Sequence, residues 1–237
     1  MRLQDFRVLT FDCYGTLIDW ESGIFAALGP LLARVPLPPS RNAVLEDFAR
    51  RESEEEARNP TLRYPALLAK VHHHLAEDWG IAPDENEARR FGASVPDWPP
   101  FPDSPAALAE LERHCQLVIL SNVDRASFGA SNRRLGVAFD AVFTAEEIGS
   151  YKPDPANFRY LVDHLAERGV RKEDILHTAQ SLYHDHLPAK RAGLATAWID
   201  RRHDREGFGA TPAPSEEVRT DFRFPTLAAM AEAWRTG

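Results

Sequence analysis

The chain has 237 residues, of which 43% are hydrophobic and 27% charged, proportions typical of a globular protein that buries a core. A formal net charge of -8 argues against a nucleic-acid surface, which needs clustered Lys and Arg. Two cysteines, Cys13 and Cys115, are too few for a disulfide framework, and no stretch resembles a signal peptide or a membrane span. We therefore expect a cytoplasmic protein with no nucleic-acid or membrane partner.

Short apolar runs alternate with helical patterns along most of the chain, which predicts a parallel sheet with crossover helices. The predicted strands are 7–13, 116–120, 141–144, 174–179 and 195–200. The clearest core helices are 106–114, 155–168 and 184–193. The predicted fold class is therefore α/β, with a Rossmann-like parallel sheet as its core.

The segment between the first two predicted strands has a helical pattern throughout. Its candidate helices are 22–34, 41–58, 64–79 and 84–94, and no strand pattern interrupts them. A proline-rich return at 98–102 disfavours helix and stiffens the linker. We therefore predict an α-helical cap domain at 19–99, inserted into a catalytic core formed by 1–18 and 100–237. Such a cap closes over a site, excludes water and contributes substrate contacts.

The first apolar run, at 8–11, delivers Asp12 into a turn made by Gly15. Glycine permits a sharp backbone turn where other residues clash. Open parallel sheets bind their ligands beyond the carboxyl ends of the strands, which makes Asp12 a candidate nucleophile. The alternative is that Asp12 only caps a following helix.

Three later segments also carry polar groups at predicted strand ends or in loops, at 117–122, 149–155 and 177–185. Taken in order with the Asp12 segment, they resemble the four signature segments of the haloacid dehalogenase superfamily. Those segments carry a nucleophilic Asp, a Ser or Thr, a Lys and a terminal acidic loop. The resemblance covers essentially the whole chain and implies a hydrolase with a capped α/β core.

Two positions differ from the phosphatase branch of that superfamily. Tyr14 stands where phosphatases have a second Asp that protonates the leaving alcohol, a proton that a halide does not need. Gln180 stands at the first position of the acidic pair that binds magnesium in phosphatases, which leaves Asp185 alone. Because magnesium is usually held through carboxylates, we expect no metal and no other cofactor.

Both departures, together with the sequences around Asp12, Ser121 and Lys152, are similar to the L-2-haloacid dehalogenase branch, also called type II. The resemblance implies that Asp12 attacks the carbon bearing the leaving group and that water then releases the resulting ester. It makes Thr16 and Ser121 hydroxyl partners of the nucleophile or of the substrate carboxylate. Lys152 would keep Asp12 ionised, and Asp185 would pair with Lys152 or orient the hydrolytic water.

The same resemblance suggests the residues that bind the substrate. Asn122 resembles a halide-cradle residue, and Arg50 is the candidate for the cap arginine that binds halide in the family. Further substrate-binding candidates are Tyr14, Gln180 and Ser181. The chain departs from the branch at Phe158, where the dehalogenases have a tyrosine six residues after the signature lysine, and in the sequence of the terminal loop.

Several charged side chains have two interpretations. The run Arg50–Glu56 predicts a solvated helix face, although Arg50, Arg51 or Arg63 could turn inward to hold a carboxylate. His184 could act as a base near neutral pH, or serve only at a helix start or in packing. The consecutive histidines 72–74 point in different directions on a helix and cannot share a metal.

The primary prediction is a cofactor-independent hydrolase that acts on a small 2-substituted carboxylate, most simply a 2-haloacid. One alternative is hydrolysis of L-azetidine-2-carboxylate by the same mechanism, because its ring nitrogen already carries a proton. Others are a magnesium-dependent phosphatase and a binding module without turnover; the joint presence of Asp12, Ser121, Lys152 and Asp185 argues against the last. A homodimer is the default expectation for a soluble oligomer.

Overall fold

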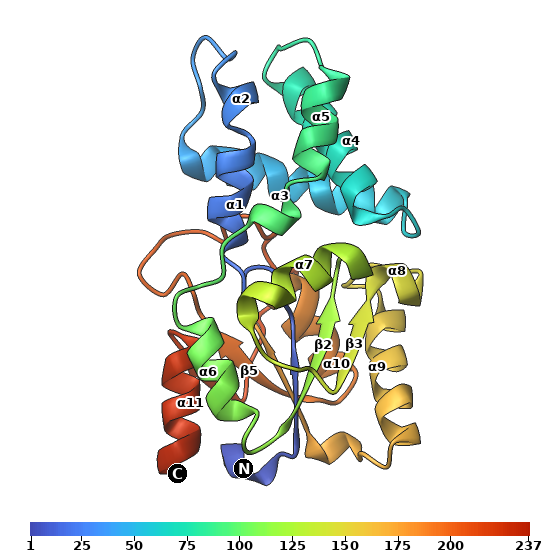
Figure 1. Cartoon of the computed structure of the whole chain (residues 1–237), viewed down its shortest axis with the longest axis vertical. Helices are drawn as coiled ribbons and strands as arrows, with labels where there is room; N and C mark the ends of the chain where they lie inside the picture. The colour runs from blue at the N-terminus through green and yellow to red at the C-terminus, as the bar shows by residue number, and fades with distance from the viewer.

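A six-stranded parallel sheet forms the centre of the computed structural model, which describes residues 1–237 (Figure 1). The strands lie in the order β3-β2-β1-β4-β5-β6, and the predicted α/β class is confirmed. Their bounds are β1 Val8–Phe11, β2 Gln116–Ser121, β3 Ala141–Thr144, β4 Ile175–Ala179, β5 Ala195–Ile199 and β6 Phe222–Phe224. Strand β6 was not predicted, because it is only three residues long and its side chains are partly exposed.

Helices cover both faces of the sheet, so that alternate residues of one strand pack on opposite sides. Leu9 and Phe11 of β1 belong to an apolar cluster that includes α6 (Ser104–Leu111), α7 (Arg125–Leu135) and α11 (Leu227–Thr236). Val8 belongs to a second cluster, with α9 (Pro155–Glu167) and α10 (Leu187–Arg191). Burial on both faces explains why these strands appear as continuous apolar runs in the sequence. The shorter helical segments of the core are Leu3–Asp5, α8 Ala145–Ile148, Lys172–Asp174 and the π-helical turn Leu182–His186.

Residues 19–99, here called the helical insertion, leave the sheet after β1 and lie above its carboxyl edge (Figure 1). Its helices are α1 Trp20–Ala27, α2 Gly29–Leu32, α3 Arg41–Arg58, α4 Tyr64–Asp78 and α5 Glu85–Gly92, followed by the 3-10 turn Val95–Asp97. The helix predicted at 22–34 is divided into α1 and α2, since Pro30 has no N–H to continue the helical hydrogen bonds. No helix of the fold has the length and apolar character needed to span a bilayer.

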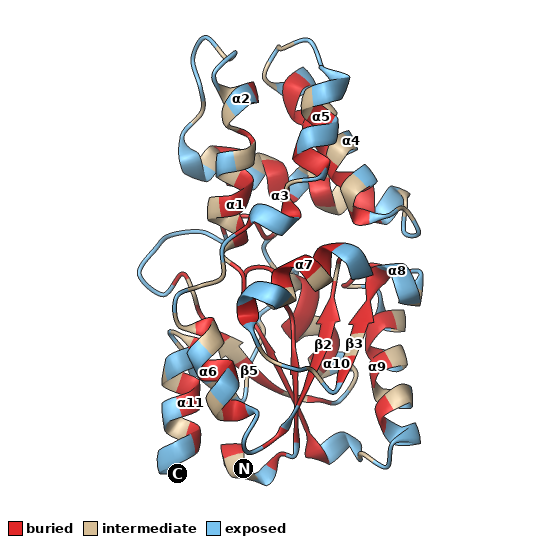
Figure 2. Cartoon of the chain, viewed as in Figure 1, coloured by how far each residue is buried: buried red, intermediate tan, exposed pale blue.

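The chain enters and leaves the helical insertion at one place. The Asp19 N–H donates to the Pro99 carbonyl at 2.8 Å, and the Phe101 N–H donates to Leu17 at 3.0 Å. Gly23 of α1 lies against Trp98, and a side-chain carbon there would approach the indole to within 2.3 Å. Buried residues continue from the sheet into the insertion through this crossing (Figure 2).

The long loop between β5 and β6 forms a further contact with the helical insertion. Arg202 donates to both carboxylate oxygens of Glu21, at 2.9 and 2.7 Å, and the Ala210 N–H donates to the same side chain at 3.3 Å. Gly209 has a φ of +67°, and a side-chain carbon there would come within 1.8 Å of Glu21 Oε1. The loop therefore fits closely against α1.

Candidate active site

Asp12 is the first polar residue after β1, and its carboxylate is held on both oxygens. The Asp12 N–H donates to Thr178 of the adjacent strand β4 at 3.1 Å, which fixes the backbone at the carboxyl edge of the sheet. Thr16, after the turn at Gly15, donates its hydroxyl to Asp12 Oδ2 at 2.8 Å. Thr16 is therefore a hydroxyl partner of Asp12, at the position expected from the sequence.

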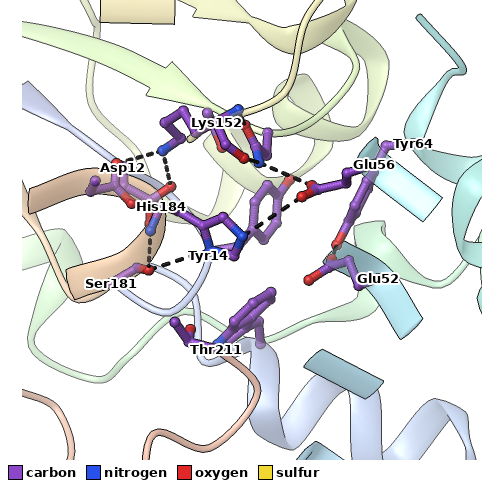
Figure 3. A pocket seen from close by; sticks show the side chains of 13 residues that line it. Asp12, Tyr14, Glu52, Glu56, Tyr64, Lys152, Ser181, His184 and Thr211 are labelled. Carbon is purple, nitrogen blue, oxygen red and sulfur yellow. Dashed lines mark hydrogen bonds and ion pairs between the residues drawn. The ribbon is translucent and has the colours of Figure 1, made fainter. Parts of the chain in front are cut away.

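Lys152 reaches Asp12 from the loop between α8 and α9, as the sequence predicted. Its ammonium donates to Asp12 Oδ1 at 3.0 Å, to Asp185 Oδ1 at 2.6 Å and to the Leu120 carbonyl at 3.0 Å. An ammonium has three N–H donors, so these three contacts use all of them. Both ion pairs are buried, and such pairs are sensitive to the loss of one partner (Figure 3).

The two carboxylates that share Lys152 differ in their electrostatics. Burial alone raises the pKa of Asp185, but the charge of Lys152 and the hydrogen bond from His177 outweigh it, so that this pKa lies below its usual range. Burial raises the pKa of Asp12, and the opposing effects of Lys152 and Thr16 do not fully cancel it. Asp185 is thus the main counter-charge of Lys152, and Asp12 keeps more of its basicity.

Behind Asp185 lies a buried hydrogen-bond chain that the sequence analysis did not assign. His177 Nε2 lies 3.0 Å from Asp185 Oδ1, and His177 Nδ1 lies 2.8 Å from the hydroxyl of Thr10. Phe158, at the position of the expected tyrosine, packs edge-on against the same imidazole with ring centroids 5.0 Å apart. The signal in the sequence was His177 itself, a polar residue in the middle of an apolar strand. This chain connects the interior of the sheet to the Lys152 ammonium.

Ser121 ends β2, Asn122 follows it, and both line the same cavity as Asp12. The hydroxyl of Ser121 is buried and has no hydrogen-bond partner in the protein. The Asn122 amide donates to the Lys152 carbonyl at 2.9 Å and to Glu56 of α3 at 3.0 Å. Ser121 is free to contact a ligand, whereas the side chain of Asn122 connects the core to the helical insertion.

The opposite wall of the cavity is acidic, which the sequence analysis did not predict. Glu52 and Glu56 of α3 are 2% and 5% exposed and line the cavity together with Tyr64 of α4 (Figure 3). The Tyr64 hydroxyl donates to Glu52 Oε1 at 2.6 Å. The expectation of a solvated face at Arg50–Glu56 is therefore wrong for these glutamates. They continue, at helical spacing, the buried stripe of Val44, Leu45, Phe48 and Ala49, and this spacing was the signal.

Arg50 does not reach the cavity, which corrects its assignment as a substrate-binding residue. Its side chain is 45% exposed and pairs with Asp47 and Asp78, at 3.1 and 2.9 Å. Arg51 also pairs with Asp78, and Arg63 pairs with Glu146 at the surface. The residues lining the cavity include no arginine.

The loop after β4 divides the remaining candidates between two cavities. Ser181 lines the Asp12 cavity, as predicted, and its Oγ accepts from the His184 N–H at 2.9 Å. Gln180 instead lines a neighbouring cavity of about 530 Å³ near Arg201, and its side-chain oxygen lies 3.5 Å from the Thr211 hydroxyl. The assignment of Gln180 as a substrate contact in the Asp12 site is therefore corrected.

Two further side chains of the cavity are uncharged. Burial lowers the pKa of His184 to about 4, and its Nε2 has no hydrogen-bond partner, although it lies 3.7 Å from Glu56 Oε2. Burial raises the pKa of Tyr14 well above its usual value, and its hydroxyl lies 3.0 Å from Ser131 Oγ. Ser181, not His184, caps the turn that follows, which leaves His184 Nε2 available to a ligand.

The acids of the cavity do not fit a magnesium site. Asp185 Oδ1 already contacts both Lys152 and His177, and Gln180, which replaces the first acid of the family's metal pair, lies in another cavity. No group of three or more His, Cys, Asp or Glu side chains is arranged to hold a metal ion. These side chains therefore do not form a magnesium site.

Comparison with known families gives one match, which covers most of the chain. Residues 6–193 match the family model described as haloacid dehalogenase-like hydrolase. No curated protein matches the sequence.

Solved structures with the same fold include several dehalogenases. The defluorinating L-2-haloacid dehalogenase Rha0230 superposes with a TM-score of 0.78 at 22% identity, covering 100% of this chain and 99% of that chain. The L-2-haloacid dehalogenase of Xanthobacter autotrophicus, with chloropropionic acid covalently bound, gives 0.77 at 21% identity over 98% and 99%. The putative HAD-hydrolase YfnB of Bacillus subtilis, bound to magnesium, gives 0.74 at 18% over 99% and 100%.

Proposed function

The chain belongs to the haloacid dehalogenase-like hydrolases, and from that membership we propose that it displaces a leaving group from C2 of a small 2-substituted carboxylate without a cofactor. The observation that carries the proposal is the position of Asp12. Its carboxylate is buried, is held by Thr16 and Lys152, and lines a cavity in which no second acid follows it at position 14. Tyr14 lies there instead, its hydroxyl beside Ser131.

The first step forms an ester on Asp12. A carboxylate oxygen of Asp12 attacks C2 of the substrate, a C–O bond forms, and the bond from C2 to the halide breaks with its electron pair. Lys152 keeps Asp12 in place and balances the buried charge at 3.0 Å. A halide leaves without a proton, so that no general acid is needed at the position of Tyr14.

The second step releases the product by hydrolysis. Water attacks the side-chain carbonyl carbon of the ester, the bond between this carbon and the ester oxygen breaks, and a 2-hydroxy acid leaves while Asp12 is restored. One proton of this water ends on the oxygen of the 2-hydroxy acid, and the other leaves to solvent as Asp12 ionises again. Asp185, 2.6 Å from the Lys152 ammonium, is the group to which we assign the orientation of this water and the first acceptance of its proton. In this scheme the helical insertion acts as a cap that keeps other water out.

The cavity must open for a substrate to enter. Its volume is about 30 Å³ in this closed arrangement, which holds about two water molecules at about 10–15 Å³ each. The smallest 2-haloacid has five heavy atoms and does not fit in the space of two water molecules. We therefore infer that the helical insertion moves away from the sheet edge during each turnover, as lids commonly do.

A specific observation favours L-azetidine-2-carboxylate as a second candidate substrate. Its ring nitrogen is a cation when protonated, and Glu52 and Glu56 form an acidic wall opposite Asp12. A magnesium-dependent phosphatase is the remaining alternative, and the contacts of Asp185 with Lys152 and His177 argue against it.

The test uses purified, chelator-treated protein with 2-haloacids, L-azetidine-2-carboxylate and phosphate monoesters, while halide, ring-opened product and phosphate are measured. Halide release without metal supports the proposal. Ring opening alone keeps the mechanism and changes the leaving group. Phosphate release that requires added magnesium overturns it.

A further inference from the structure

The cavity around Asp12 is lined by more carboxyl groups than cationic groups. Four carboxyl groups line it, those of Asp12, Asp185, Glu52 and Glu56, and Lys152 is the only Lys or Arg among its residues. The three N–H donors of Lys152 are already bonded to Asp12, Asp185 and the Leu120 carbonyl. A second anionic group of a substrate therefore finds no free cation here.

Acceptor atoms are concentrated on the wall formed by α3. The Tyr64 hydroxyl contacts Glu52 Oε1 and the Asn122 amide contacts Glu56 Oε1, so each carboxyl group is positioned through one oxygen. The second oxygen of Glu56 lies 3.7 Å from His184 Nε2, a buried nitrogen without a hydrogen-bond partner. His184 is neutral at pH 7, and in the tautomer that carries its proton on Nδ1, which faces Ser181 Oγ at 3.3 Å, Nε2 accepts a hydrogen bond.

Free donors are found on the wall formed by the sheet edge. The Ser121 hydroxyl is buried without a partner. The backbone N–H groups of Tyr14 and Asn122, two residues that line the cavity, also donate no hydrogen bond within the protein. These donors are suited to a carboxylate beside Asp12, so the cavity has a donor wall at the sheet edge. The acceptor wall of Glu52 and Glu56 lies across the cavity from Asp12 (Figure 3).

We propose that Glu52 and Glu56 bind an ammonium group, so that the substrate is a 2-substituted carboxylate with an amino group on its side chain. This inference rests on the proposed function for the reaction at C2, and it assigns a role to the acidic wall. The carboxylate of the substrate would occupy the donor wall, its C2 would face Asp12, and its ammonium would occupy the acceptor wall. Tyr64 and Asn122 act as positioning residues for the two glutamates.

The buried acids gain most from such a ligand because they lack a cation. Burial raises the pKa of Glu52 to about 8 and that of Glu56 well above its usual value. The charged or titratable groups that face them are Asp12, Tyr64, Tyr151, Lys152, Tyr183, His184 and Asp185. An ammonium group favours their ionised forms, so binding at pH 7 should release protons.

Matched pairs of substrates test the inference directly. We would compare 2-chloropropionate with 3-amino-2-chloropropionate, and 2-chlorobutyrate with 4-amino-2-chlorobutyrate, by halide release. The amino compound of at least one pair should have a kcat/KM at least tenfold higher, equivalent to about 1.4 kcal/mol. Halide release from both members without that preference, or with the plain haloacid preferred, would overturn the inference and leave the proposed function intact.

Substitutions then locate the preference. Glu52→Gln and Glu56→Gln keep the shape of the side chain and remove its negative form, and each should reduce the amino preference by about tenfold, about 1.4 kcal/mol. The matched control is Glu55→Gln, a buried glutamate of the same helix that bonds Arg58 and Asn59 outside the cavity. An unchanged preference in both cavity variants would refute the assignment, and the comparison of substrates on the unaltered protein does not depend on whether a variant folds.

Equilibrium binding separates this inference from the proposed reaction. Calorimetry with 4-amino-2-hydroxybutyrate and 2-hydroxybutyrate, in two buffers of different ionisation enthalpy, reports affinity and proton release without turnover. Tighter binding of 4-amino-2-hydroxybutyrate, accompanied by proton release, would support the acidic site. If at the same time no substrate releases halide, the displacement reaction is rejected. Equal affinity, or no binding of either compound, would reject the acidic site.

Discussion

The two walls of the cavity are built in opposite ways. On the sheet side, the chain from Thr10 through His177, Asp185 and Lys152 to Asp12 consists of paired groups at 2.6 to 3.0 Å. On the helical side, Glu52 and Glu56 are buried with one positioned oxygen each and without a cation. A network in which every group has its hydrogen-bond partner holds one geometry. Buried carboxyl groups without a cation instead favour the binding of a ligand that supplies one. We infer that the sheet determines the reaction and the insertion determines which molecule undergoes it.

The strongest test of the sheet wall is Asp12→Asn. The amide has nearly the shape of the carboxylate but is not a nucleophile, so turnover should fall more than about 1000-fold, ~4 kcal/mol. Halide release is the measurement, with thermal unfolding as a control for folding. Turnover close to that of the unaltered enzyme would show that Asp12 is not the nucleophile.

Lys152→Ala should have the next largest effect. It leaves Asp12 and Asp185 buried without their shared cation, and breaking a buried pair typically costs about 3–5 kcal/mol of stability. We expect kcat/KM to fall at least about 100-fold, ~2.7 kcal/mol, in enzyme that is still folded at low temperature. A loss of less than tenfold would remove the lysine from the mechanism.

His177 tests how far the network extends into the sheet. His177→Ala removes the group between Thr10 and Asp185, and we expect about a tenfold loss of kcat/KM, ~1.4 kcal/mol. His177→Gln, which retains an N–H donor near Asp185, should restore part of the activity. If both variants lose stability but keep full activity, the chain has only a structural role.

The helical wall can be distinguished from the sheet wall by pH. The folded pKa of Glu52, about 8, lies above its unfolded value of about 4.3, so its protonated form favours folding. This contribution is complete below about pH 4.3 and is lost as pH rises through 8. Glu52→Gln should remove that loss and raise the free energy of unfolding at pH 8 relative to the unaltered protein.

Asp185 should give the reverse dependence in the same denaturation experiments. Its folded pKa is lowered, so its contribution is present above the unfolded pKa of about 3.9 and is lost as the solution becomes more acidic. The outcome that contradicts the Glu52 prediction comes from the same experiments. If Glu52→Gln leaves the slope of the free energy of unfolding against pH unchanged between pH 5 and 8, Glu52 does not hold its proton in the folded state.

Arg50→Ala should have the smallest effect. Its pairs with Asp47 and Asp78 are exposed, and exposed pairs contribute about 0–1 kcal/mol. We expect kcat/KM for every substrate to change less than about twofold, ~0.4 kcal/mol. A large loss of activity would mean that Arg50 reaches the substrate when the insertion moves, and it would weaken the acidic description of this wall.

The sequence predicted the sheet wall better than the helical wall. Asp12 follows β1, Ser121 ends β2 and Lys152 lies in a loop at the same sheet edge, so the strand pattern brings them together. Lys152 pairs with Asp12, and Ser121 lines the same cavity. Five of the six strands and the helix 41–58 were also predicted from periodicity. In these segments local pattern and tertiary packing favour the same structure.

The helical wall depends on which side of α3 faces the sheet edge. A stretch rich in Arg and Glu normally faces water, and the burial of Glu52 and Glu56 comes from the docking of the insertion. Arg50 was assigned to the site by resemblance, and its neighbours Asp47 and Asp78 hold it outside. Helix α7 was missed because its apolar positions are few, and the apolar helix α11 was not predicted either.

The contact between Arg202 and Glu21 affects how the insertion could be exchanged between proteins. The chain crosses between the two parts at Asp19 and Pro99, which suggests a cassette with two junctions. The loop that contains Arg202 and Gly209 adds a third, non-covalent attachment, and its Thr211 lines the cavity. A chimaera that transplants the insertion into another scaffold must therefore carry this loop as well, or it will lose both the attachment and part of the site.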